Sequence, residues 1–220
     1  PTPIKYKTAC LDVLGEIGRS VIEGGGKGLT ELVYAQVLDE LELEKHISGN
    51  ASSSHNPPPP VFVATGTTCA ANLLPSPLSS LPLLTSSATL YARGLTHPAW
   101  TVKLASLLAL ARICRLATDE ALAETSARSN SAVSVFIDAA GRGMGTGKFW
   151  RVRRAAAGLL VEIARRGVGG VGGGAGNGRA NLRAEKERIV ELARVGGGDR
   201  GGGGQREAEK VRGIVGLEWG

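Results

Sequence analysis

Apolar residues recur at steps of three and four along three segments of the chain. In the most regular segment charged residues occupy the intervening positions, so a helix there would have one apolar and one polar face. Its apolar positions are Trp150, Val152, Ala155, Ala156, Leu159, Leu160 and Ile163. The matching positions are Trp100, Val102, Ala105, Ala109, Leu110 and Ile113 in the middle segment, and Tyr6, Ala9, Cys10, Val13, Leu14 and Ile17 in the first. The pattern predicts three amphipathic helices with these residues facing a core.

The three segments share one register. Their alignment superimposes Lys7, Lys103 and Arg153, which lie 96 and then 50 residues apart. Because the first interval is close to twice the second, we expect one degenerate repeat between the first two segments, within residues 61–95. Recurrence at this scale is typical of a repeat array.

Further helices are predicted between and after these segments. Polar residues that can cap a helix begin two of them, Thr118 or Asp119 in one and Ser129 or Asn130 in the other. The predicted ranges are 29–41, 118–127, 129–140, 182–193 and 207–217. The sequence therefore predicts an alternation of helices and turns.

The middle and last segments carry a family resemblance. Trp100 to Leu110 reads Trp-Thr-Val-Lys-Leu-Ala-Ser-Leu-Leu-Ala-Leu, and Trp150 to Leu160 reads Trp-Arg-Val-Arg-Arg-Ala-Ala-Ala-Gly-Leu-Leu. Both resemble the second helix of HEAT repeats, which has the pattern Val-Arg/Lys-x-x-Ala-x-x-x-Leu, and Lys7 to Ile17 is a weaker third copy. The resemblance implies an all-α fold, a right-handed α-solenoid of HEAT/armadillo-like helix pairs with glycine-rich and proline-rich loop insertions.

Low-complexity inserts divide the chain. Segments rich in Ser, Pro or Gly cannot repay the entropy of ordering by burying apolar surface, so they predict loops. The resulting units are a first repeat at 1–47, a Ser/Pro-rich linker at 48–60, central repeats at 61–166, a Gly-rich loop at 167–178, a helix at 179–195, a second Gly-rich loop at 196–204 and the start of a further helix at 205–220. Because the chain opens on Pro1 and its apolar pattern is already running by Tyr6, we expect a fragment of a larger protein.

Charge is distributed unevenly. Residues 151–220 hold 14 Lys and Arg against 8 Asp and Glu, whereas residues 1–150 hold 12 of each. A basic C-terminal portion can bind nucleic acid, an acidic lipid or an acidic protein surface. The alternative interpretation is a set of solvated helix faces.

No metal, cofactor or membrane segment is predicted. Cys10, Cys69 and Cys114 are far apart in the sequence and form no metal-binding spacing, so we expect small core residues in a reducing, intracellular compartment. The longest apolar stretch, Leu104 to Ala111, is far shorter than a membrane span.

The Gly-rich stretch from Gly141 to Lys148 superficially resembles a phosphate-binding loop. That loop requires Gly six residues before the Lys and Ser or Thr after it, and here Arg142 and Phe149 hold those positions. No Gly-x-Ser-x-Gly motif and no paired carboxylates are present. We therefore predict no catalytic residue and no cofactor, and a nucleotide-binding enzyme that uses Lys148 is the weaker alternative.

The function that follows from the resemblance is protein–protein interaction, as a scaffold or adaptor, because stacked helix pairs present a long surface to an extended partner. Four arginines on the polar face of the last segment are the candidate partner contacts: Arg151, Arg154, Arg165 and Arg166. Nucleic-acid binding through the basic C-terminal portion is the alternative. Trp100 and Trp150 are predicted to pack at helix starts or to anchor a partner.

Overall fold

The computed structural model describes residues 4–23, 27–48, 57–126, 131–168, 186–197, 209–210 and 213. These residues are mostly helical and contain no β-strand; they include one isolated β-bridge, between Leu78 and Ala117. The predicted all-α class is confirmed.

The helices begin and end where the local chemistry allows. Pro60 and Pro82 lie in the first turns of their helices, where the missing N–H would have no helical partner. The elements are α1 (Ile4–Glu23), α2 (Lys27–Glu40), α3 (Leu43–Ile47), α4 (Pro60–Asn72), α5 (Leu81–Arg93), η1 (Gly94–Thr96), α6 (Trp100–Leu116), α7 (Asp119–Ser126), α8 (Ala132–Met144), α9 (Trp150–Val168) and α11 (Lys186–Gly197).

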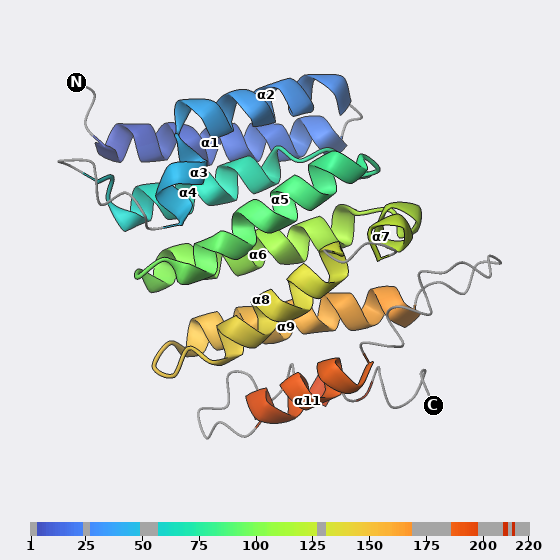
Figure 1. Cartoon of the computed structure of the whole chain (residues 1–220). Coiled ribbons are helices and arrows are strands. Elements are labelled where there is room, and N and C mark those ends of the chain that lie inside the picture. Colours follow the sequence, from blue (N-terminus) through green and yellow to red (C-terminus); the bar gives the residue numbers. More distant parts are fainter. Residues whose placement is uncertain are drawn as a thin grey trace.

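The helices pack in two rows (Figure 1). In the first row α1, α4, α6 and α9 lie side by side, and in the second row α3, α5, α8 and α11 follow one another. Helix α2 packs on α1, α3 and α4, and the short α7 packs on α5 and α8. From α4 onward the long helices alternate between the rows, and from α5 onward each one packs on the next.

The predicted register holds in α6 and α9. Val102, Leu110 and Ile113 are fully buried in α6, and the aligned Val152 and Leu160 are fully buried in α9. The region from 61 to 95, where a degenerate repeat was predicted, contains most of α4 and all of α5. Helix α4 lies between α1 and α6 in the first row, and α5 lies in the second row.

The register prediction is wrong for α1. Val13 and Ile17 are 59% and 55% exposed, and the helix buries Leu11 and two glycines instead. A Cβ on Gly18 would lie 2.3 Å from Leu73 Cδ2, and one on Gly15 would lie 3.2 Å from the Cα of Cys69. Helix α4 therefore approaches α1 along its glycine side. Of the predicted stripe, Leu14 packs partly against the core, whereas Val13 and Ile17 face outward.

Side chains also join the helices through polar contacts. Arg112 of α6 donates from Nε to the carbonyl of Ala71 at 2.9 Å and from Nη2 to that of Asn72 at 3.4 Å. These carbonyls belong to the last turn of α4, where the helix itself supplies no donors. Arg112 thus fixes the end of α4 against the C-terminal part of α6.

A second polar contact lies in the core. The hydroxyl of Tyr34 in α2 lies 2.9 Å from Ser87 Oγ in α5. The Tyr91 hydroxyl donates a hydrogen bond to the Tyr34 hydroxyl at 3.5 Å. Burial is the main cause that raises the pKa of both tyrosines. The buried hydroxyls have partners, as core polar groups require.

Predicted boundaries shift by a few residues. Thr118 Oγ1 accepts from the Ala121 N–H at 3.2 Å and caps α7 as expected, whereas α8 is capped by Ser131 instead of Ser129 or Asn130. Helices α9 and α11 run two residues into the predicted Gly-rich loops. Most of the predicted linker and loops and most of 205–220 lie outside the described residues.

We predict that Gly143 in α8 tolerates no side chain. Its Cβ would lie 2.7 Å from Ala156 Cβ and 2.9 Å from Leu107 Cδ1, so Gly143→Ala is expected to lower the free energy of unfolding by about 1–3 kcal/mol through overpacking. The matched control is Gly158→Ala in α9, whose Cβ would meet nothing within 4 Å. That variant is expected to be neutral or more stable by up to about 1 kcal/mol in urea unfolding. Equal stability of the Gly143 variant and the wild type would contradict the packing.

Candidate partner-binding groove

Helices α6 and α9 lie next to each other in the first row, and a groove of about 410 Å³ opens between them. Its floor is apolar and is formed by Leu104, Leu108 and Ala111 of α6 and Ala155 of α9. Gly158 also lines the groove and contributes no side chain. The small residues on α9 therefore leave the leucines of α6 open to solvent, and Leu108 is 54% exposed.

Aromatic rings stand at one end of this α6–α9 groove. Trp150 lines it and is 47% exposed, whereas Trp100 is half-buried against the core. Phe149 stacks on Trp100, with centroids 6.3 Å apart and planes 19° from parallel. The Arg151 guanidinium carbon lies 5.7 Å from the Trp100 centroid and 5.4 Å from that of Trp150. These cation–π contacts hold Arg151 over the rings.

Charged side chains form the rim. Arg115 comes from α6, and Arg151 and Arg154 come from α9. Glu162 is the one carboxylate among the residues that line the groove, and it lies 3.3 Å from Arg115 and 3.5 Å from Arg165. The rim therefore carries a surplus of positive charge above an apolar floor.

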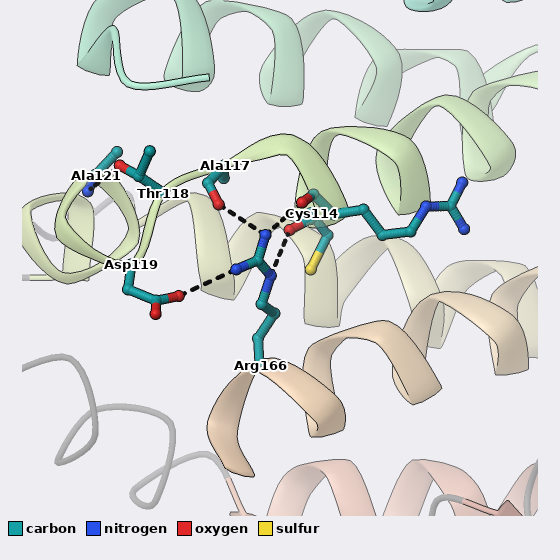
Figure 2. Close-up of polar contacts among 7 residues, drawn as sticks. Cys114, Ala117, Thr118, Asp119, Ala121 and Arg166 are labelled. Carbon is teal, nitrogen blue, oxygen red and sulfur yellow. Dashed lines mark hydrogen bonds and ion pairs between the residues drawn. The ribbon is translucent and has the colours of Figure 1, made fainter. Parts of the chain in front are cut away.

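Arg166 is partly buried, and its guanidinium points to the C-terminal end of α6 (Figure 2). Its Nε donates to the carbonyl of Cys114 at 3.2 Å, and its Nη2 donates to the carbonyls of Arg115 and, at 2.8 Å, Ala117. Its Nη1 lies 3.1 Å from a carboxylate oxygen of Asp119 in the first turn of α7. The guanidinium thus satisfies the carbonyl end of α6 and joins it to α7 and α9.

The four predicted arginines separate into two groups. Arg151 and Arg154 line the groove, whereas Arg165 pairs with Glu162 beside it and Arg166 holds the end of α6. Leu108 is not among the site residues predicted from the sequence. The sequence pattern could have indicated its exposure, because Leu108 is apolar but falls outside the stripe of apolar positions that α6 buries.

The Gly-rich stretch from Gly141 to Lys148 begins in the last turn of α8, which ends at Met144, and continues into the connection to α9. Arg153 donates to the carbonyls of Thr146 and Gly147, which holds the turn against α9. The residues before the turn form helix α8, whereas a phosphate-binding loop follows a strand. Lys148 itself is exposed.

The described thiols and imidazoles lie apart from one another or have other roles. Cys69 and Cys114 are buried as predicted, but Cys10 is exposed on α1. His97 accepts a hydrogen bond from the Ala99 N–H at 3.0 Å at the start of α6, and burial lowers its pKa. Among the described residues no group of three or more His, Cys, Asp or Glu could hold a metal ion. None of the described helices combines the length and the apolarity that a membrane crossing requires.

A larger hollow of about 1020 Å³ lies in the other face of the molecule, between α2, α3 and α5. Two of the acidic side chains that line it have partners, since Glu42 lies 3.2 Å from Lys45 and Glu44 lies 2.7 Å from Arg93. The α6–α9 groove, with its positive surplus and exposed apolar floor, is therefore the better-defined candidate site.

The chain matches no protein-family model, no curated protein and no solved structure.

We predict that Arg166 is structural and that Arg165 is not. Arg166→Ala leaves carbonyls at the end of α6 without their donor and is expected to cost about 1–3 kcal/mol of unfolding free energy. Arg165→Ala is the matched control, because Arg165 is exposed and the variant removes one ion pair, with Glu162, expected to be worth about 0–1 kcal/mol. Urea unfolding of both variants measures the difference. Equal losses would show that the contacts in Figure 2 carry no net stability.

The cysteines give a test of burial by thiol alkylation. Burial is the main cause that raises the pKa of Cys69 to about 11 and that of Cys114 to about 12. At a pH of about 9, near the ordinary thiol pKa, these two buried thiols are expected to stay protonated and unlabelled in the native protein. Mass spectrometry should find native label on Cys10 alone, and on all three cysteines after unfolding in urea. Native labelling of Cys114 would contradict its place beneath Arg166.

Proposed function

We propose that this chain is a protein–protein interaction scaffold built on a HEAT/armadillo-like solenoid, and that the α6–α9 groove is its contact site. Two features support the solenoid. The long helices alternate between two rows, and α6 and α9 bury the same positions of a shared register. Solenoids of this kind expose elongated surfaces that bind extended partners.

The groove carries the proposal because it combines apolar exposure with positive charge. Leu108 and Trp150 are each about half exposed, and a partner that covered them would remove apolar surface from water at roughly 25 cal/mol per Å². Arg115, Arg151 and Arg154 stand around that floor. Aromatic residues and arginines are the residue types that dominate binding energy at protein interfaces.

The rim charge indicates the chemistry of the partner. A segment with a bulky apolar side chain would fill the space over Leu108, and flanking carboxylates would meet the guanidinium groups. Arginine forms bidentate hydrogen bonds with carboxylates, and these are stronger than bonds between neutral groups. The proposed partner is therefore an extended acidic segment with an apolar anchor, in an intracellular protein.

Nucleic-acid binding stays the alternative prediction. Several described C-terminal arginines have carboxylate partners, with Arg165 near Glu162, Arg188 near Asp138 and Arg194 near Glu191. A carboxylate beside each guanidinium opposes the approach of phosphate. These pairs weigh against a phosphate contact along the C-terminal helices, whereas the residues that line the groove include three arginines and one carboxylate.

We predict that peptides selected from a random display library on the wild-type chain will contain acidic residues around an apolar one. Arg151→Ser with Arg154→Ser is expected to weaken the selected peptides by about tenfold or more, because both rim charges are lost. Leu108→Asp is expected to weaken them similarly by placing a charge on the apolar floor. Fluorescence anisotropy with labelled peptides measures each affinity.

Arg165→Ser is the matched control, since it removes an arginine from the same helix that does not line the groove. Its affinity should stay within about twofold of the wild type. Failure to select any peptide, or equal loss in the control, would refute the groove as the contact site. If single- and double-stranded oligonucleotides bind instead, with affinity that falls steeply with salt, the nucleic-acid alternative replaces it.

A further inference from the structure

The two ends of the α6–α9 groove hold their arginines in different ways. Where both helices start, Arg151 of α9 lies over the rings of Trp100 and Trp150. Toward their C-termini, Glu162 of α9 lies 3.3 Å from Arg115 of α6. The two helices therefore run parallel. We call the side of Trp150 and Arg151 the aromatic end of the groove, and the side of Arg115 and Glu162 its carboxylate end.

At the carboxylate end, the charge of the arginine is already compensated. One carboxylate oxygen of Glu162 lies 3.3 Å from Arg115 and 3.5 Å from Arg165. The Glu162 side chain is 16% exposed, so water and salt screen its contacts less than they screen an ion pair on the open surface. Glu162 therefore competes with any incoming carboxylate for Arg115, and its own charge repels that carboxylate.

At the aromatic end, the arginine is held without a carboxylate. The guanidinium carbon of Arg151 lies 5.4 Å from the Trp150 centroid and 5.7 Å from the Trp100 centroid. Along the described stretches of the chain, no Asp or Glu pairs with Arg151. An aromatic ring attracts a cation without neutralising it. Arg151 is thus held in place and keeps its charge for a partner.

Leu108 marks the middle of the groove floor. It lies eight residues after Trp100 and seven residues before Arg115. At a rise of about 1.5 Å per residue, these intervals are about 12 Å and about 10 Å along α6. An extended segment advances about 3.3 Å per residue, so a carboxylate at the aromatic end lies about three residues from an apolar anchor over Leu108. A second carboxylate at the same spacing on the other side of the anchor would lie at the carboxylate end.

We propose that the bound segment has its acidic residue on one side of the apolar anchor only, at the aromatic end, and that Glu162 sets this polarity. Arg151 binds the acidic residue, whereas Glu162 withholds Arg115 and repels a second carboxylate. Specificity of this kind combines an attractive element with a repulsive one. The inference rests on the proposed function of the groove and narrows its partner to a segment with an acidic residue about three positions from a bulky apolar one and a neutral residue on the other side.

The test uses peptides selected on the full chain from a display library. Each library peptide has a central leucine, one glutamate three positions before it, one glutamate three positions after it and random neutral residues elsewhere. Fluorescence anisotropy measures the affinity of the best peptide and of its two versions in which one glutamate is replaced by glutamine. On the wild-type chain, one replacement is expected to weaken binding about tenfold or more, and the other by less than about twofold. Arg151→Ser in the chain should abolish the difference between the two versions.

Glu162→Gln identifies the cause of the asymmetry. In this variant the second glutamate is expected to become favourable, so that its replacement weakens binding about threefold or more. The matched control is Glu187→Gln, which removes the same charge from α11, outside the groove, and should leave the second glutamate without effect. Equal contributions of the two glutamates on the wild type, or no effect of Glu162→Gln, would overturn this proposal and leave the groove as the contact site if Leu108→Asp still weakens the peptide. Failure to select any peptide would overturn the proposed function and this proposal together.

Discussion

The carbonyl groups at the C-terminal ends of α4 and α6 set the spacing of the first row. Each helix end has carbonyls without helical partners, and burying them unpaired would cost free energy. An arginine from the next first-row helix satisfies them in both cases, Arg112 for α4 and Arg166 for α6. Because a guanidinium has a fixed reach and geometry, each helix is held at one position along its neighbour, and the α6–α9 groove follows from that position.

Much of the fold can be predicted from the sequence where helices pack through leucine, valine and alanine. The stripes of α6 and α9 are buried as their periodicity predicts, because both helices have neighbours on either side. The prediction failed for α1, where packing depends on Gly15 and Gly18. A glycine adds nothing to a hydrophobic pattern, yet it allows α4 to approach closely, so the buried side of α1 could not be recognised from apolar periodicity.

The candidate site was predictable in part. Arg151 and Arg154 belong to the polar face that periodicity assigns to α9, and they line the groove. In the sequence Arg166 cannot be distinguished from Arg151 and Arg154. The three backbone carbonyls that it contacts, at the C-terminal end of α6, come within hydrogen-bonding distance only when α6 and α9 pack together. The place of Leu108 in a groove could not be predicted for a related reason. Its exposure arises because α9 places the small residues Ala155 and Gly158 across from it.

The two ends of the described stack differ, and this gives the molecule a direction. At one end α1 exposes Val13 and Ile17, while at the other the described residues of α11 expose the charged side chains of Glu187, Arg188, Glu191 and Arg194. Head-to-tail growth into filaments requires complementary surfaces at both ends. The described apolar face of α1 and the described charged face of α11 lack that complementarity, so these two faces do not suit head-to-tail packing of one copy on the next.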